Sequence, residues 1–220
     1  IAYTSGTTGH PKGAMQSHNA VILNSAMTSQ MHIRGENDVV VSALPCPHVY
    51  ANVIMIGMMM FGTRLILHKI FEVDTIFESI KANKATIFDG VPTMYMFMLN
   101  SPNLKNADLS SLNRCYVGGQ TMPVATMTAV EREFKVPLIE LWGMTEIAGL
   151  GATFPLFGPN KHGSIGCAIP YCDLKIVDVN DCSKQMNIGE VGELMVKGPI
   201  TMMGYFGDDK KTKETLEPDG

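Results

Sequence analysis

The chain has 220 residues, of which 45% are hydrophobic and 17% charged, with a net charge of −4. This composition can bury a core and excludes an intrinsically disordered chain, and no basic stripe typical of nucleic-acid binding is present. The most apolar stretch, residues 51–61, is shorter than the roughly 20 residues that a membrane-spanning helix needs. We therefore expect no nucleic-acid partner and no transmembrane segment, and a cytoplasmic protein that is either free or peripheral at a membrane.

The first 35 residues predict a strand, a loop and a helix in that order. Apolar residues open the chain, a stretch rich in glycine and threonine follows, and a helix-like pattern runs from about residue 18 to 32. The chain starts inside what reads as a strand and stops in mid-pattern at Gly220. We therefore interpret it as a fold truncated at both ends.

Residues 39–143 alternate between strand-like and helix-like segments. The strands are predicted at residues 39–44, 63–67, 85–90, 114–119 and 138–143. The helices are predicted at about 50–60, 74–83, 92–99 and 123–134, with Asp74 as an N-cap and Pro92 and Pro123 in first turns. Such alternation favours an α/β fold, in which helices flank a parallel sheet on both faces.

The pattern changes after a loop rich in glycine and proline at residues 150–162. Residues 172–179 and 192–198 alternate as strands, and Asn180, Asp181 and Gly189 between them are turn residues. These segments predict a partial antiparallel β unit at the C-terminal end, as part of a small barrel.

A loop rich in hydroxyl groups and glycine, residues 3–13 (YTSGTTGHPKG), carries the strongest chemical signal. Backbone N–H groups, hydroxyls and one ammonium are the groups that wrap a polyphosphate. Pro11 before Lys12 and Gly13 after it exclude a Walker loop, and with it a P-loop kinase or ATPase. By composition alone, a flexible surface turn would explain the segment equally well.

The full string TSGTTGHPKG resembles the phosphate-binding signature of the adenylate-forming superfamily. That superfamily covers acyl-CoA synthetases, firefly-type luciferases and the adenylation domains of peptide synthetases. Further segments match in order along nearly the whole chain: LPCPHVYA (44–51), the Gly-Gly-Gln at 118–120, WGMTE (142–146), GSIG (163–166), GEL (192–194) and KGPITMMGYF (197–206). The resemblance implies that a carboxylic acid is activated with ATP as its acyl-AMP and passed to coenzyme A.

The resemblance also assigns roles to single residues. The β- and γ-phosphates of ATP would be held by Thr4, Ser5, Gly6, Thr7, Thr8, Gly9 and Lys12. Thr145 would contact the α-phosphate, and Glu146 would bind Mg²⁺, since a hard cation prefers carboxylate oxygen. The alternative for Glu146 is a solvated loop acid.

The adenine side and the acyl side of the expected site are carried by other segments. Gly118, Gly119 and Gln120 are similar to the adenine-side loop, or else form a plain turn between a strand and a helix. The segment Trp142, Gly143, Met144 and Thr145 adds contacts to the nucleotide. Trp142 stands where a tyrosine is commoner in the family, and it either stacks on adenine or is a core aromatic. His48 is expected near the acyl pocket, with a satisfied loop histidine as the alternative.

The family pattern implies three parts in this chain and further parts outside it. Residues 1–35 would belong to a first subdomain, residues 36–150 to a β/α subdomain with the nucleotide and acyl sites, and residues 151–220 to a partial β-barrel. The ribose-binding Asp, the hinge and the catalytic Lys of the family have no counterpart here. We therefore expect the 220 residues alone to be inactive and to self-associate through truncated edges.

The substrate is the least determined part of the prediction. Residues 91–99 (VPTMYMFML) and the methionine-rich segment 55–60 favour an apolar, adaptable pocket for a medium- or long-chain fatty acid. Core packing would explain the same methionines. An aryl acid as substrate, a carrier protein in place of coenzyme A as acceptor, and a non-catalytic relative stay open as alternatives.

Overall fold

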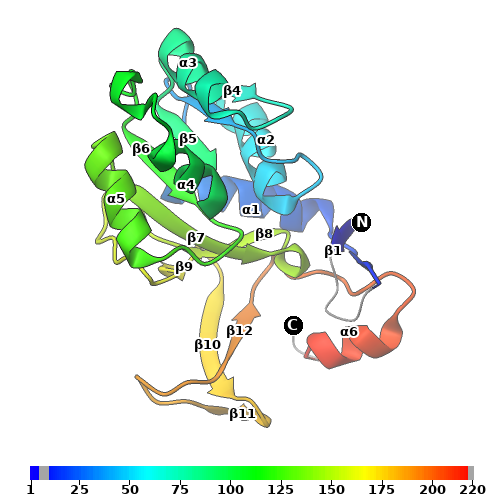
Figure 1. The fold of residues 1–220 in the computed structure, drawn as a ribbon. Coiled ribbons are helices and arrows are strands. Elements are labelled where there is room, and N and C mark those ends of the chain that lie inside the picture. Colours follow the sequence, from blue (N-terminus) through cyan, green and yellow to red (C-terminus); the bar gives the residue numbers. More distant parts are fainter. Residues whose placement is uncertain (5–9, 218–220) are drawn as a thin grey trace.

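The computed structural model describes residues 1–4 and 10–217. Its centre is a seven-stranded sheet in the order β4-β3-β5-β6-β7-β8-β9 (Figure 1). The strands from β4 to β7 run parallel, and β8 and β9 are added antiparallel at one side. The bounds are β3 Val39–Ser42, β4 Arg64–Leu67, β5 Ile87–Gly90, β6 Arg114–Val117, β7 Leu138–Met144, β8 Gly149–Thr153 and β9 Cys167–Ala168.

Helices cover both faces of this sheet (Figure 1). One face carries α1 (His18–Met31) and α2 (Val49–Phe61), whose apolar side chains form one core with Ile139 and Leu150. The other face carries α3 (Val73–Asn83), α4 (Pro92–Asn100) and α5 (Val124–Phe134), which form a second core with Phe88 and Leu138. The predicted α/β fold with flanking helices is confirmed.

Two small antiparallel sheets lie outside this body. The first pairs β1 (Ala2–Thr4) with β2 (Lys12–Ala14). The second has the order β11-β10-β12 and projects away from the main sheet (Figure 1). Its strands are β10 (Asp173–Asp178), β11 (Asp181–Gln185) and β12 (Glu193–Lys197), and α6 (Asp209–Thr215) follows near the C-terminus. Short 3-10 turns, η1 (Leu104–Asn106) and η2 (Thr145–Ile147), complete the described elements.

Several local predictions are wrong in detail. Asp74 is not the N-cap of α3: that position is Glu72, and the Asp74 carboxylate lies in the first turn and accepts from Asn103. Pro123 is the N-cap residue of α5 rather than part of its first turn, whereas Pro92 opens α4 as expected. Asp181 begins strand β11 instead of serving only as a turn residue.

The predicted loop at 150–162 begins inside the main sheet. Residues up to Thr153 form β8, which is buried along its whole length against α1 and α2. The glycines of this segment look like loop residues in the sequence, but here they allow close packing, since a Cβ on Gly149 would lie 2.6 Å from the Asn24 side chain. Helix α1 likewise packs on α2 and β8, and the separate first subdomain stays a prediction.

The two methionine-rich segments do not share one pocket along their lengths. Met98 of α4 is fully buried in the core on one face of the sheet, whereas α2 lies on the other face. Met59 and Met60 of α2 are exposed to solvent, at 66% and 42%. Only the beginning of α4, at Met94, contacts both cores. The expected joint acyl pocket is therefore wrong for most of both segments.

Candidate adenylate-forming site

The predicted residues Lys12 and Glu146 meet at Tyr205, which comes from a third, distant part of the chain. The Lys12 ammonium donates to the Tyr205 hydroxyl at 3.3 Å, and that hydroxyl donates to Glu146 Oε1 at 2.6 Å. The Lys12 ammonium also lies 4.5 Å from the centre of the Tyr205 ring. Burial, and then the Glu146 carboxylate, raise the pKa of the Tyr205 phenol, so it keeps the proton that it donates.

Thr145 is fixed beside these residues through its backbone. Its carbonyl accepts a hydrogen bond from Gln16 Nε2 at 2.7 Å. Gln16 lies two residues after the end of β2, so this contact connects the segment of Lys12 to the turn η2 that holds Thr145 and Glu146. Lys12 is far from Thr145 and Glu146 in the sequence, and the fold brings these two segments together.

The loop between β1 and β2 begins and ends at this point. Thr4 and Lys12 pair across the two strands, so they define the ends of the loop. The Thr4 hydroxyl is buried and has no hydrogen-bond partner among the described residues. Ser5, Gly6, Thr7, Thr8 and Gly9, which were predicted to hold phosphates, lie outside the described residues.

The residues predicted for the adenine side lie at the carboxyl edge of the parallel strands. Gly118 and Gly119 follow β6 directly, and Gln120 is exposed. Gly118 is buried against β7, where a Cβ would lie 2.1 Å from Leu141 Cδ1, and Gly119 has a φ of +87°. Both positions require glycine, and this edge is where open α/β sheets bind ligands.

Trp142, Gly143 and Met144 form the end of β7 next to this edge. The Trp142 side chain is half-buried and packs on the α1/α2 core, with its ring against Gly151 of β8. Gly143 and Met144 are exposed. Trp142 therefore has a core contact, while its stacking on adenine stays a prediction.

His48 is the N-cap of α2. Its Nδ1 accepts from the backbone N–H of Tyr50 at 3.2 Å, and partial burial lowers the pKa of its imidazole. Its neighbours Cys46, Pro47 and Val49 line a cavity of about 640 Å³ between α1, α2 and β1. His48 itself is not among the residues that line this cavity, and its role toward an acyl group stays a prediction.

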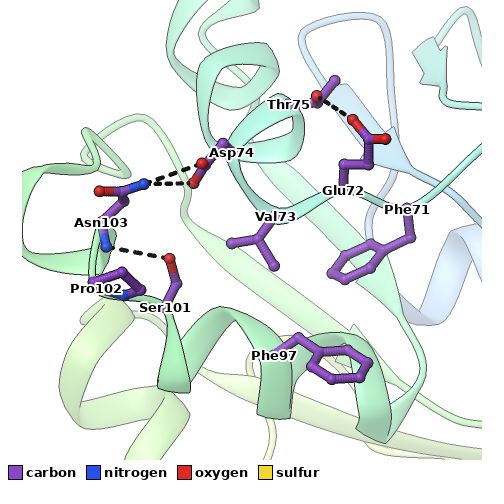
Figure 2. Close-up of a pocket in the computed structure, with 9 residues that line it drawn as sticks. All are labelled: Phe71, Glu72, Val73, Asp74, Thr75, Phe97, Ser101, Pro102 and Asn103. Carbon is purple, nitrogen blue, oxygen red and sulfur yellow. Dashed lines mark hydrogen bonds between the residues drawn. The ribbon is translucent and has the colours of Figure 1, made fainter.

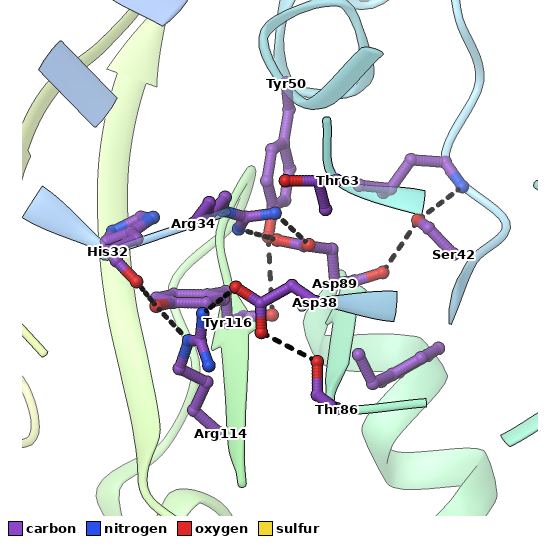
Figure 3. Close-up of polar contacts among 12 residues, drawn as sticks. His32, Arg34, Asp38, Ser42, Tyr50, Thr63, Thr86, Asp89, Arg114 and Tyr116 are labelled. Atoms are coloured by element: carbon purple, nitrogen blue, oxygen red, sulfur yellow. Dashed lines mark hydrogen bonds and ion pairs between the residues drawn. The ribbon is translucent and has the colours of Figure 1, made fainter. Parts of the chain in front are cut away.

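A network of buried charges runs from Asp38 and Arg114, at the amino ends of β3 and β6, to Asp89 in β5, and the sequence did not predict it. Arg34 forms a bidentate ion pair with Asp89, with both N–O distances at 2.8 Å, and Tyr50 donates to Asp89 at 3.1 Å (Figure 3). Arg114 pairs with Asp38 at 2.7 Å. The signal was an Asp inside an apolar strand, residues 85–90.

His32 completes this network as a neutral side chain. Its ring stacks on Tyr116 with centroids 4.0 Å apart, and Nε2 shares a hydrogen bond with Thr153 at 3.0 Å. Burial, and then the charges of Arg34 and Arg114, lower the pKa of His32 well below its ordinary range. Its other ring nitrogen, Nδ1, is buried and has no hydrogen-bond partner among the described residues.

A second hollow, of about 470 Å³, lies between α3 and α4 (Figure 2). Phe71 and Phe97 give it an apolar side, and Glu72 and Asp74 give it an acidic rim. The Asp74 carboxylate is already occupied by Asn103. Of the residues predicted for the nucleotide or acyl site, Phe97 of the segment 91–99 alone is among those that line this hollow.

Comparison with known proteins identifies the class that this fold and site define. Residues 1–206 match the model of the AMP-binding enzyme family, so the chain belongs to that family. It is 34% identical to an indoleacetate–CoA ligase of Aromatoleum aromaticum, over 99% of this chain and 42% of that protein. It is 32% identical to a long-chain-fatty-acid–CoA ligase of Bacillus subtilis, over 98% of this chain and 39% of that protein.

Solved structures agree with this assignment. An ATP-bound MatB from Rhodopseudomonas palustris superposes with a TM-score of 0.91 at 30% identity, over 100% of this chain and 43% of that chain. An o-succinylbenzoate CoA synthetase from Bacillus subtilis, in complex with its acyl-adenylate intermediate, superposes with a TM-score of 0.87 at 28% identity, over 99% and 44%. The chain thus spans about two fifths of the length of the relatives it matches.

Proposed function

We propose that the protein containing this chain activates a carboxylic acid with ATP and then transfers the acyl group to coenzyme A. The observation that carries this proposal is the meeting of Lys12 and Glu146 at Tyr205, where the loop between Thr4 and Lys12 ends. One cation and one carboxylate, beside a loop of hydroxyls and backbone donors, suit a metal–polyphosphate ligand. Membership in the AMP-binding enzyme family supports the same reaction.

The first step joins two anions, so the residues act mainly on charge. A carboxylate oxygen of the acid bonds to the α-phosphorus, and the bond from that phosphorus to the β-phosphate oxygen breaks. Pyrophosphate leaves with the electron pair. Lys12 neutralises phosphate charge, the Thr4 hydroxyl donates to a phosphate oxygen, and Thr145 lies beside the α-phosphate.

Glu146 fits the role of the Mg²⁺ ligand. Its Oε1 accepts from Tyr205, and its other oxygen has no partner among the described residues. No cluster of three or more acidic, His or Cys side chains surrounds it within that same part of the chain. Mg²⁺ commonly binds one or two carboxylates together with phosphates and water, so a single carboxylate is sufficient. When bound, the ion supplies further neutralisation of phosphate charge.

In this proposal, the adenine base binds at the carboxyl edge of β6 and β7. The backbone of Gly118, Gly119 and Gln120 approaches the adenine closely because two of these residues have no side chain. Trp142 offers the exposed part of its ring as a stacking surface. Gly143 and Met144 contact the nucleotide beside it.

For the acid, we propose a medium- or long-chain fatty acid. The apolar residues that line the cavity beside His48, among them Val21, Ile22 and Ile56, support this choice. The names of the relatives include indoleacetate, long-chain fatty acid and 4-coumarate, so an aryl acid is the second candidate. No described helix is both long and apolar enough to cross a membrane. A cytoplasmic or membrane-peripheral location is part of the proposal.

Acid-dependent exchange of pyrophosphate into ATP tests the function in the full-length protein. Fatty, aryl and amino acids are supplied separately, beside a Lys12→Ala variant and the exposed control Lys210→Ala. We expect exchange with a fatty acid, about 100-fold slower in Lys12→Ala and unchanged in Lys210→Ala, because Lys12 contacts the charge that develops. Addition of coenzyme A then identifies the acceptor.

The other outcomes of this experiment are equally informative. Exchange only with aryl acids would show that the substrate is an aryl acid rather than a fatty acid. Thioester formation only on a carrier protein would show that the acceptor is that protein rather than coenzyme A. A folded protein that binds ATP and shows no exchange with any acid would contradict the proposal. The 220 residues alone are expected to give no exchange, because the family's ribose and lysine contacts have no counterpart in them.

A further inference from the structure

The segment 202–206 connects the turn that holds Glu146 to the strand that holds Lys12. The Met202 N–H donates to the Glu146 carbonyl at 2.7 Å. On the other side, the Phe206 N–H donates to the Gly13 carbonyl at 2.8 Å, beside Lys12. One short segment is therefore hydrogen-bonded both to the turn of Glu146 and to the strand of Lys12.

Tyr205 lies at the middle of this segment and is itself held rigidly. It is 2% exposed and packs with Ala14 and Met202, and its N–H donates to Thr212 Oγ1 at 2.8 Å. The aromatic ring of Tyr205 would be sufficient for this packing without the hydroxyl. The hydroxyl reaches past this packing to both charged groups.

The chemistry of a phenol suits the position between these two charges. A hydroxyl can accept from an ammonium and donate to a carboxylate at the same time. Lys12 and Glu146 would otherwise attract each other, and a direct ion pair would hide both charges from a ligand. Through Tyr205, each group makes one hydrogen bond, so within the described part of the chain the second carboxylate oxygen and the other ammonium protons stay available for a ligand.

We propose that Tyr205 is a positioning residue of this site, whose hydroxyl holds the Lys12 ammonium and the Glu146 carboxylate apart and oriented toward a metal–polyphosphate ligand. The inference rests on the proposed function of Lys12 and Glu146. It adds that the segment 202–206 is part of the phosphate site, although this segment lies more than 190 residues from Lys12 in the chain.

The first arm of the test uses the full-length protein without ligand. Tyr205→Phe keeps the ring and removes the hydroxyl, and Tyr171→Phe, at an 84% exposed position, is the matched control. Lys12 acetylation by acetic anhydride is followed by peptide mass spectrometry. We expect acetylation about threefold faster in Tyr205→Phe, because one hydrogen bond of the ammonium is lost, and no change in Tyr171→Phe.

The second arm measures the ligand directly. Trp142 is the single tryptophan of this stretch, so a Trp142→Phe difference assigns the fluorescence change on addition of ATP and Mg²⁺. The Mg²⁺ concentration for half-maximal change should rise about tenfold in Tyr205→Phe, since a hydrogen bond to a charged group is lost. The double variant Glu146→Gln/Tyr205→Phe should raise this Mg²⁺ concentration by less than the product of the two factors found in the single variants.

The outcomes separate this inference from the proposed function. Unchanged acetylation or unchanged Mg²⁺ dependence in a folded Tyr205→Phe variant overturns the inference, while losses in Lys12→Ala and Glu146→Gln would leave the function standing. If the wild-type protein shows no fluorescence change with ATP and Mg²⁺, the proposed function is contradicted. The acetylation rate of Lys12 alone then tests the role of Tyr205. Should Tyr205→Phe not fold, Glu146→Ala replaces it: faster acetylation of Lys12 supports the proposal, and an unchanged rate overturns it.

Discussion

At the scale of single residues, the Arg34–Asp89 pair is the most consequential feature outside the site. Asp89 is fully buried and Arg34 is nearly so, and the two make a bidentate contact. The Arg34 guanidinium also lies 4.7 Å from the centre of the Tyr116 ring. The pair joins the segment after α1 to β5, and its contact with Tyr50 extends it to α2. It therefore fixes elements on which the candidate site depends.

Removal of one partner should be costly, because the other charge stays buried. We expect Asp89→Ala to lower the free energy of unfolding by about 3–5 kcal/mol. The matched control is Glu133→Ala in the exposed Arg132–Glu133 pair, which should cost less than about 1 kcal/mol. Urea unfolding followed by circular dichroism measures both. A loss below about 1 kcal/mol in Asp89→Ala would show that Arg34 reaches water when unpaired.

Two ordered motifs predict Lys12, Thr145 and Glu146 as site residues, and the fold brings their segments together. Their roles toward a nucleotide stay predictions. Tyr205 was quoted inside a third motif, yet nothing in the sequence indicates that its hydroxyl faces Lys12. The partners of Asp89 were equally hidden, because a charge within an apolar strand signals burial and does not name its counter-ion.

At the scale of elements, the contact between α1 and α2 shows how a glycine determines packing. Gly57 lies in the middle of α2, where glycine is normally unfavourable by about 1 kcal/mol relative to alanine. A Cβ at this position would lie 2.7 Å from Ser29 Oγ of α1. The glycine thus allows the two helices to approach closely over the main sheet.

We therefore expect Gly57→Ala to destabilise the protein by about 1 kcal/mol despite the better helix propensity of alanine. Ser29→Ala in the same chain should restore most of the loss, because it removes the clashing oxygen. Gly35→Ala is the control, since a Cβ there meets nothing within 4 Å. Thermal unfolding midpoints compare the four proteins. Greater stability of Gly57→Ala would show that α1 moves away freely.

Element boundaries followed from the sequence where periodicity was clear. The five parallel strands and four of their helices lie within a few residues of the predicted ranges. The strands β2, β8, β9 and β11 and the helix α6 were missed. β8 is rich in glycine, and the others are short, so their conformation comes from neighbours rather than from their own propensity.

At the scale of the whole molecule, the sheet of β10, β11 and β12 projects from the main body (Figure 1). The loops that join its strands carry exposed apolar side chains. The most exposed of these are Ile188 and Val191, between β11 and β12, and Val179, between β10 and β11. Exposed apolar groups next to the strands of a projecting sheet favour association. This arrangement is the physical basis of the predicted self-association of the 220 residues.

We expect the 220-residue chain to associate in a concentration-dependent way, as measured by light scattering after size-exclusion chromatography. Ile188→Lys combined with Val191→Lys should shift the distribution toward the monomer. Ile70→Lys, at a 66% exposed position outside this sheet, should not. A monomer at all concentrations for the unchanged chain would contradict the prediction.

The sequence by itself determined the fold class, the main strands and helices, and the identity of the family. Those properties depend on local periodicity and on contiguous motifs, which a linear chain displays directly. Only the tertiary structure decided that Tyr205 stands between Lys12 and Glu146, that Arg34 pairs with Asp89, and that the two methionine-rich segments lie on opposite faces of the sheet. These features depend on which distant segments the folded sheet brings within a few ångströms, and no local pattern encodes that distance.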